Sequence, residues 1–327
     1  MRRFLNAALL FISYHFSRIT RKAWMPALPS AIAVEPTTSC NLRCPECPSG
    51  LRSFTRPTGM LDQKLFEKIS DEIKSHAAYL TFYFQGEPYL HPQFTEMVAT
   101  AAKQKLTTVT STNAHYLTPE NARKTIASGL SKLIISLDGV SQESYSNYRI
   151  GGKLSTVLEG ARTLMQMRQE MQSATPFVVF QFLVVRANEN EIEAAKKLAA
   201  EIGVDEIVFK TAQLYDYENG NELMPENEEF SRYVRMPNGK YKLRGQLLNQ
   251  CWKMWHSCVV TWDGKVVPCC FDKDAAHQLG DLTSQSLKHI WKNSSYQNFR
   301  GAILQSRNSI DICANCSEGT KVFAASN

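Results

Sequence analysis

The cysteines are the residues of this chain whose type and spacing indicate chemistry most directly. Three of the nine lie between Cys40 and Cys47, and the other six lie between Cys251 and Cys316. Thiolates are soft ligands that suit zinc, copper(I) and iron–sulfur clusters. Because the chain has 327 residues and an odd number of cysteines, it is not a small disulfide-stabilised domain. Both groups therefore indicate ligation of a metal ion or a cluster.

The first group, Cys40, Cys44 and Cys47, has no fourth cysteine or histidine close to it in the sequence. A closed structural zinc site needs four ligands. A 4Fe–4S cluster also takes four thiolates, so three would leave one iron with an open position where a ligand can bind and react. The alternatives are unrelated core cysteines, or a zinc site that a distant residue completes.

Strand-like and helix-like segments alternate from residue 31 to residue 215 and must position these cysteines. The predicted strands cover residues 31–37, 79–85, 106–112, 132–137, 177–185 and 206–211. The predicted helices cover residues 62–75, 94–104, 152–172 and 191–202, with a further helix starting at Thr118. This alternation predicts an α/β fold with a parallel sheet, either doubly wound or a partial barrel, whose functional residues follow the carboxyl ends of the strands.

The motifs after these strands resemble the radical SAM superfamily over residues 31–215. The cysteine spacing matches its CxxxCxxC signature, and Gln85-Gly86-Glu87-Pro88 is similar to its GGEP motif. Further matching motifs follow in order, at Ser111–Asn113, Ser136–Gly139 and Tyr148–Arg149. Two positions depart from the family pattern. Glu46 stands where an aromatic residue is usual, and Gln85 replaces the first glycine of GGEP.

The resemblance implies a partial (β/α)6 TIM-like barrel with a 4Fe–4S cluster on Cys40, Cys44 and Cys47. The open iron would bind S-adenosylmethionine, and reductive cleavage would give a 5′-deoxyadenosyl radical that abstracts a substrate hydrogen. The residues expected to bind this cofactor are Gly86, Glu87, Pro88, Asn113, Ser136, Arg149 and Gln181. Structural roles are the alternative for Glu87 and for the turn at Asn113. Gln85 and Lys210 are the candidate catalytic residues, the lysine as a base for a substrate radical.

The second group of cysteines resembles the SPASM or twitch extension of radical SAM enzymes, over residues 251–316. Trp262-Asp263-Gly264 predicts a hairpin turn between short strands. Two auxiliary clusters would need eight thiolates and only six are present, so we expect one auxiliary 4Fe–4S cluster, and two clusters in all. The expected ligands are Cys251, Cys269, Cys313 and Cys316, with Cys258 or Cys270 as replacements. A four-cysteine zinc ribbon is the alternative.

Four segments are predicted from these patterns. They are a basic amphipathic extension at 1–30, the radical SAM partial barrel at 31–215, a linker or flap at 216–250 and the auxiliary-cluster domain at 251–327. The extension supplies five basic residues and no acid, and its apolar stretch is too short to span a bilayer. It is expected either to pack on the main domain or to lie on an anionic membrane surface.

The net charge of +6 is concentrated in the extension, so the near-neutral remainder argues against nucleic-acid binding. The expected activity is a radical SAM oxidation of a small polyol, sugar or lipid-linked substrate, because a fully ligated auxiliary cluster suits electron acceptance. The alternatives are a peptide- or protein-modifying maturase and a non-catalytic zinc or iron–sulfur protein. A flavodoxin or ferredoxin is the expected electron donor. The expected location is the cytoplasm, and membrane association follows only under the alternative in which the extension lies on a membrane surface.

Overall fold

The computed structural model describes residues 1–318, so the last nine residues of the predicted 251–327 domain lie outside the described residues. The chain forms two compact units. Over the described residues, unit 1 contains residues 1–39, 54–109 and 247–318, and unit 2 contains residues 40–53 and 110–246. Among residues 1–318, no helix is long and apolar enough to cross a membrane. The four predicted segment boundaries stay predictions.

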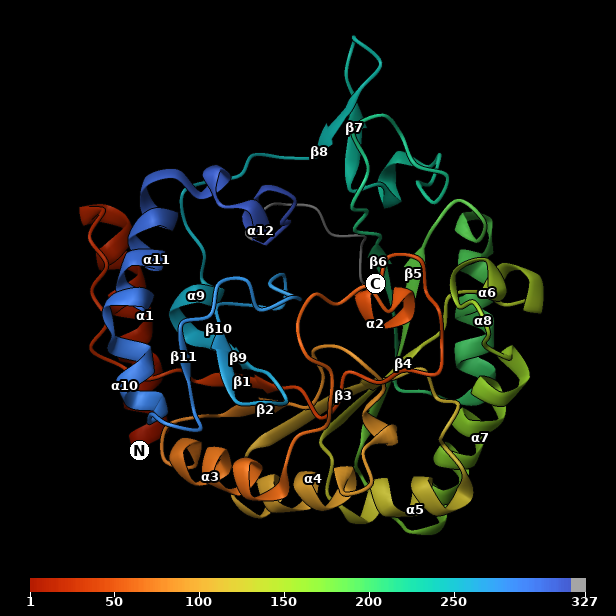
Figure 1. Ribbon diagram of the computed structural model, residues 1–327. Helices are drawn as coiled ribbons and strands as arrows, with labels where there is room; N and C mark the ends of the chain where they lie inside the picture. The colour runs from red at the N-terminus through yellow and green to blue at the C-terminus, as the bar shows by residue number, and fades with distance from the viewer. Residues whose placement is uncertain (319–327) are drawn as a thin grey trace. The chain divides into compact units, whose positions relative to one another are not determined.

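The sheet of unit 1 combines strands from both ends of the chain. Strand β1 (Ala31–Val34) lies between β2 (Tyr79–Thr81) and β9 (Ser257–Val260) and is parallel to both. The start of β3 (Thr107–Thr112) pairs with β2, also in parallel. Strands β9 and β10 (Lys265–Val267) form an antiparallel hairpin, and β11 (Gly280–Asp281) extends it. The hairpin turn predicted at Trp262-Asp263-Gly264 is therefore confirmed, and Figure 1 shows the hairpin beside β1.

The helices of unit 1 bury apolar faces around this sheet. Helix α3 (Gln63–Ile73) begins at Asp62, whose side chain accepts hydrogen bonds from the amides of the first turn, and buries Phe66, Ile69 and Ile73. The remaining helices are α1 (Arg2–Thr20), η1 (Pro88–Leu90), α4 (Phe94–Lys103), α9 (Lys253–His256), α10 (Leu287–Lys292), α11 (Ser294–Ser306), η4 (Arg307–Ser309) and α12 (Asp311–Ala314).

Helix α1 packs on unit 1 through one face. Leu10 is fully buried, and the Tyr14 ring packs edge-on against Trp252 and Trp255 of the α9 segment. The Asn6 side chain donates to the carbonyl oxygen of Leu28 at 2.8 Å and accepts from its amide at 2.9 Å. The expectation that the N-terminal segment packs on the main domain is confirmed for this face of the helix.

Unit 2 carries the second half of the predicted α/β alternation. Strands β4 (Lys132–Ser136), β5 (Phe177–Val184) and β6 (Glu206–Thr211) pair in parallel in that order. The segments between and after them are α5 (Pro119–Ala127), α6 (Gln142–Tyr148), α7 (Leu154–Glu170), η2 (Glu189–Glu191), α8 (Ile192–Ile202) and η3 (Glu228–Phe230). Figure 1 shows α6, α7 and α8 along one side of these strands. The expected α/β fold with parallel strands is confirmed in both units.

Several short elements of unit 2 were not expected, among them α6, two strands and one further short helix. The polar stretch read as a linker or flap contains the antiparallel strands β7 (Tyr233–Arg235) and β8 (Tyr241–Leu243). Their turn includes Gly239, which has a positive φ of 83°. Strands of three residues present too few alternating side chains for periodicity to mark them. Helix α2 (Pro48–Leu51) directly follows Cys47, and Pro48 suits its first position.

Candidate cluster and cofactor sites

The loop from Cys40 to Cys47 rests against the carboxyl ends of strands in unit 2. Cys44 is buried, and Cys40 and Cys47 are half-buried. Val185, directly after β5, and Leu214, shortly after β6, belong to the same apolar cluster as Cys44. The structure therefore brings the three thiols to the edge of the sheet where the sequence predicted function.

Arg149 places a positive charge beside the most buried of these thiols. Its Nη1 lies 3.7 Å from Cys44 Sγ, and its Nε donates to Asp138 Oδ2 at 2.5 Å. The second Asp138 oxygen accepts from the amide of Leu183 on β5 at 2.8 Å. Burial raises the pKa of the Cys44 thiol, and the Arg149 guanidinium opposes that rise. Arg149 is thus positioned to favour a thiolate at Cys44.

Asn113 contacts the first cysteine from the end of β3. Its Nδ2 donates to Asn41 Oδ1 at 2.8 Å and lies 3.9 Å from Cys40 Sγ. The amide of His115 donates to Asn113 Oδ1 at 3.1 Å. Asn113 therefore combines turn capping with contact to the cysteine loop, so both roles weighed from the sequence are compatible with its position.

Two residues, one in the cysteine loop and one in helix α2 directly after it, have roles that the sequence did not reveal. Glu46, the departure from the usual aromatic residue, accepts a hydrogen bond from the amide of Tyr215 at 2.9 Å through Oε2. It thereby ties the loop to the segment after β6. A Cβ on Gly50 would meet the backbone nitrogen of Cys44 at 2.5 Å, so only glycine lets α2 approach the loop this closely.

Three predicted site residues share one face of the β4–β5–β6 sheet. The register pairs Ser136 with Gln181, and Leu183 with Lys210. Paired residues of parallel strands point to the same face, as do alternate residues of one strand, so Ser136, Gln181 and Lys210 lie on one face. Gln181 is half-buried and Lys210 exposed, whereas Phe180 on the opposite face is fully buried. The accessible face of this sheet therefore carries the predicted polar residues.

The GEP segment of unit 1 packs closely on the backbone that follows β1. Gly86 has a φ of +75°, and a Cβ there would collide with the carbonyl oxygen of Thr37 and lie 2.9 Å from that of Ser39. The amide of Glu87 donates to the Ser39 carbonyl at 2.8 Å. The buried Glu87 carboxylate accepts from the amide of Tyr89 at 3.2 Å and caps η1, which begins at Pro88. These contacts are compatible with the structural role weighed for Glu87, and its contact with the cofactor stays a prediction.

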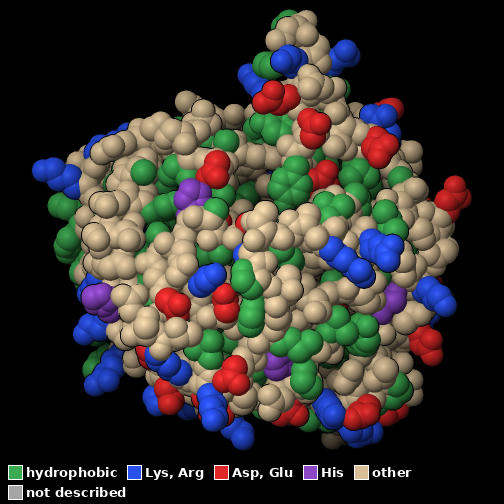
Figure 2. Space-filling view, in the orientation of Figure 1, with side chains coloured by type: hydrophobic (Ala, Val, Ile, Leu, Met, Phe, Trp, Pro, Cys, Tyr) green, Lys and Arg blue, Asp and Glu red, His purple; other side chains and the backbone are tan. Residues whose placement is uncertain are grey.

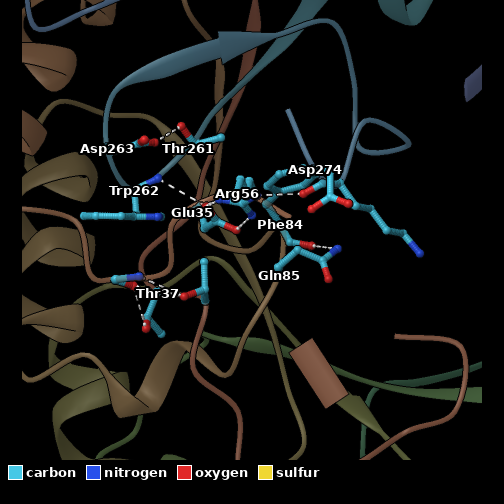
Figure 3. Close-up of polar contacts among 12 residues, drawn as sticks. Glu35, Thr37, Arg56, Phe84, Gln85, Thr261, Trp262, Asp263 and Asp274 are labelled. Carbon is cyan, nitrogen blue, oxygen red and sulfur yellow. Dashed lines mark hydrogen bonds and ion pairs between the residues drawn. The ribbon is translucent and has the colours of Figure 1, made fainter. Parts of the chain in front are cut away.

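A buried ion pair between Glu35 and Arg56, which the sequence did not reveal, lies near Phe84 (Figure 3). Arg56 donates two parallel hydrogen bonds to Glu35, at 2.8 and 2.6 Å, and Nε donates to the carbonyl oxygen of Lys273 at 2.8 Å. The amide of Trp262 donates to Glu35 at 3.2 Å. Burial raises the pKa of Glu35, and the hydrogen bonds from Arg56 and Trp262 oppose this. The pair joins the start of the sheet to the β9–β10 hairpin.

Gln85 lies close to that pair and is buried. Its Nε2 donates to the carbonyl oxygen of Phe84 at 2.9 Å (Figure 3), and the Arg56 guanidinium lies 5.6 Å from the centre of the Phe84 ring. The catalytic role assigned to Gln85 stays a prediction.

The four expected auxiliary ligands line one cavity in unit 1. Cys251, Cys269, Cys313 and Cys316 surround it, together with apolar side chains such as Phe299. The space between these side chains, including the part open to solvent, is about 350 Å³. Thiols separated by up to 65 residues of sequence therefore converge at one place. The two replacement candidates do not line it: Cys258 is buried on β9 and Cys270 is exposed.

Arg307 is one of two basic residues that line this cavity, with Lys253, and the sequence did not indicate its role. Its Nη2 lies 3.2 Å from Cys316 Sγ, and its Nη1 donates to the carbonyl oxygens of Gln250 and Glu318, at 2.8 and 2.9 Å. Burial raises the pKa of Cys251 to about 11, and Arg307 opposes the rise. A guanidinium that is itself almost fully buried therefore favours ionised thiols here.

The ligand types at both cysteine sites suit iron–sulfur clusters. Within residues 1–318, no three His, Cys, Asp or Glu side chains stand close enough to hold one metal ion. A four-iron cluster is wider than an ion, so its ligand sulfurs surround a space, as the four thiols of unit 1 do. The donor sets contain thiols alone, each with an arginine nearby to offset negative charge.

Comparison with known families identifies both regions. Residues 34–199 match the radical SAM superfamily, and residues 251–317 match the SPASM iron–sulfur cluster-binding domain. The chain belongs to the radical SAM superfamily and carries a SPASM domain. It is an enzyme, and its cofactors are S-adenosylmethionine and iron–sulfur clusters.

Several characterised proteins are similar along most of their length. The cofactor-modifying protein of the tungsten-containing aldehyde ferredoxin oxidoreductase from Pyrococcus furiosus is 25% identical over 297 residues, 82% of each chain. The AdoMet-dependent heme synthase of Methanosarcina barkeri is 26% identical over 304 residues, 83% of this chain and 84% of the relative. The crystal structure of BtrN with AdoMet and 2-DOIA shares the fold, with 20% identity, a TM-score of 0.57 and coverage of 93% and 98%.

Proposed function

We propose that this enzyme oxidises a small organic substrate, using one cluster to generate a radical and a single auxiliary cluster to accept an electron. The observation that supports this is the convergence of Cys251, Cys269, Cys313 and Cys316 on one cavity. Four thiolates complete the ligand set of a 4Fe–4S cluster, so substrate has no open iron to bind there. Electron transfer is then the chemistry that suits this site.

Cys40, Cys44 and Cys47 would hold the radical-generating cluster. When bound, this cluster and S-adenosylmethionine would supply a 5′-deoxyadenosyl radical that removes a substrate hydrogen atom. Arg149 would hold Cys44 as a thiolate and offer its remaining N–H groups to the cofactor carboxylate. Ser136, Asn113 and Gln181 would bind the polar groups of the methionine, ribose or adenine moieties.

The backbone at Gly86, Glu87 and Pro88 would receive the ammonium group of the methionine moiety. The position of Gly86 supports this. Because glycine has no Cβ, this backbone lies close to the carbonyl oxygens of Thr37 and Ser39 in the loop after β1. The Glu87 carboxylate would act mainly by capping η1 and holding this backbone in place.

Net oxidation of the substrate also needs a base. After hydrogen abstraction, loss of one proton and one electron from the substrate completes a two-electron oxidation. Lys210 is on the accessible face of the sheet with Gln181 and would take the proton, and Gln85 would orient the substrate. An external donor such as a flavodoxin or ferredoxin would return the electron needed for the next turnover.

The names of the similar proteins include two that concern cofactors or heme and one maturase, so they are compatible with a small substrate and with a peptide. One is called a heme synthase, one a cofactor-modifying protein and one the mycofactocin maturase MftC. A polyol, a sugar or a lipid-linked group is the class that we propose.

The test begins with anaerobic purification, reconstitution and measurement of iron and sulfide. We expect about eight irons per chain, and 5′-deoxyadenosine after addition of dithionite and S-adenosylmethionine. Cys44→Ala should abolish this product, whereas Cys270→Ala, at an exposed cysteine outside the cavity, should not. Bound zinc without iron, or intact clusters that never cleave the cofactor, would overturn the proposal.

The substrate class needs a second measurement. Reaction of candidate polyols, sugars and lipid-linked sugars, with detection of a product lighter by two hydrogen atoms, tests it directly. A product formed only from a peptide would move the assignment to a maturase.

A further inference from the structure

Helix α1 buries one face in unit 1 and leaves large apolar side chains exposed on the other. Phe4 is 77% exposed and Ile19 83% exposed. The other exposed large apolar side chains of the helix are Leu5, Leu9, Phe11, Ile12 and Phe16. A soluble surface carries single apolar residues routinely, but a contiguous patch of this size usually marks an interaction site.

These side chains form one continuous stripe with basic edges. At ~100° per residue, they span an arc of about 160° around the helix. Arg18 borders the arc on one side and Arg2 on the other. Lys22 follows the helix, and the first acidic residue of the chain is Glu35. Figure 2 shows hydrophobic side chains between Lys and Arg side chains at the left edge, where Figure 1 draws α1.

The helix is held in place independently of this stripe. The Arg3 guanidinium donates to the carbonyl oxygens of Lys74 and Gln104, both at 2.8 Å. The Arg21 guanidinium donates to the backbone carbonyl oxygen of Leu304 at 3.2 Å. Because the helix is already folded and fixed, the stripe can bind a surface without an ordering cost for the segment.

We propose that the exposed stripe of α1 docks the enzyme on the surface of a bilayer that contains anionic lipids. The apolar side chains would enter the acyl boundary while Arg2, Arg18 and Lys22 meet the lipid head groups. Pairing with a second copy fits less well, because a two-fold contact between antiparallel copies of α1 would bring Arg2 of one near Arg18 of the other. The inference is independent of the proposed reaction.

The test is co-sedimentation of the reconstituted full-length enzyme with vesicles. Phosphatidylcholine vesicles with phosphatidylglycerol should bind it, and phosphatidylcholine alone should bind it at least tenfold more weakly. Phe4→Ser with Ile19→Ser should weaken binding at least tenfold. Arg2→Gln with Arg18→Gln should weaken binding to anionic vesicles by about tenfold or more. Cleavage of S-adenosylmethionine should be unchanged in both variants.

Matched controls remove similar side chains from elsewhere on the surface. Phe177→Ser with Leu248→Ser removes two apolar side chains of 43% and 42% exposure, and Lys103→Gln with Lys197→Gln removes two exposed charges. Neither control should change vesicle binding. The proposal is overturned if wild-type enzyme ignores anionic vesicles, if the controls lose as much binding as the α1 variants, or if sedimentation shows a dimer that Phe4→Ser with Ile19→Ser dissociates.

Discussion

The two groups of cysteines reach their sites in different ways. The first three come from a single loop, in which Cys44 is buried and its neighbours half-buried, beside a sheet face with accessible polar residues. Four cysteines of the second group, Cys251, Cys269, Cys313 and Cys316, come from separated segments and line a cavity with mostly apolar walls. A short loop with three thiols leaves a ligand position open, whereas a convergent set of four closes it. Under the proposed function, this difference assigns reaction to the first site and electron transfer to the second.

Removing one thiol from each group gives the largest expected effect and can break this comparison. Cys44→Ala should reduce formation of 5′-deoxyadenosine to background, because the cluster that binds the cofactor loses a ligand. Cys313→Ala should keep that reaction and abolish substrate oxidation, with iron falling to about four per chain. Iron analysis and product quantification measure both. Equal loss of cofactor cleavage in the two variants would contradict the division of roles.

Substitutions in the buried Glu35–Arg56 pair test whether the stability of unit 1 depends on more than its cysteine site. Arg56→Met should destabilise the protein by about 3–5 kcal/mol, because it leaves a buried carboxylate without its partner. Denaturant unfolding measures this. In unit 2, Arg162→Met removes an exposed partner of Glu201 and should cost less than about 1 kcal/mol. The double variant Glu35→Gln with Arg56→Met should lose less than the sum of its single changes.

Acid should weaken unit 1 through His76, which lies apart from the cysteines. Burial, with help from the Arg3 charge, lowers the pKa of His76 from 6.5 to about 4. The folded protein therefore favours neutral His76. The free energy of unfolding that this preference contributes is fully present above pH 6.5 and is lost as the pH falls toward 4. We expect a loss of about 2 kcal/mol between pH 7 and pH 5. His76→Phe should remove this dependence in unfolding titrations, whereas the exposed His289→Phe should retain it.

The two arginines beside the thiols sharpen the comparison with smaller effects. Arg149→Leu should lower cofactor cleavage about 10- to 100-fold, because partners of cluster ligands typically have effects of this size. Arg307→Leu should instead weaken retention of the auxiliary iron by a similar factor, with cofactor cleavage kept. Arg149→Lys should keep part of the cofactor cleavage that Arg149→Leu loses, and Arg307→Lys should keep part of the auxiliary iron that Arg307→Leu loses. An Arg307→Leu variant that keeps all its iron would show that charge at the cavity is dispensable.

The sequence predicted the features that depend on local pattern. Apolar periodicity placed most strands and helices of the alternation within a few residues, and Thr118 caps α5 as expected. The cysteine spacing and the later motifs predicted the radical SAM and SPASM regions, because they lie in fixed order along the chain.

The sequence could not predict features formed by contacts between distant segments. Glu35 and Arg56 meet through tertiary packing, and Arg307 lies in a helical stretch that has no motif around it. Glu46 looked like a departure from the family, and its hydrogen bond to Tyr215 depends on a segment 169 residues away. Spacing carries no information about such pairs, so only coordinates reveal them.

The parallel pairing of β1 with β9 has a consequence for the time course of synthesis. The paired positions Ala31 and Ser257 are 226 residues apart. At ~5–20 residues per second, a ribosome needs about 10 to 45 s to make the intervening chain. During that interval one edge of β1 has no partner strand, and open edges promote association between nascent chains. The N-terminal cysteines emerge early, but β1 becomes an interior strand only after β9 has been made.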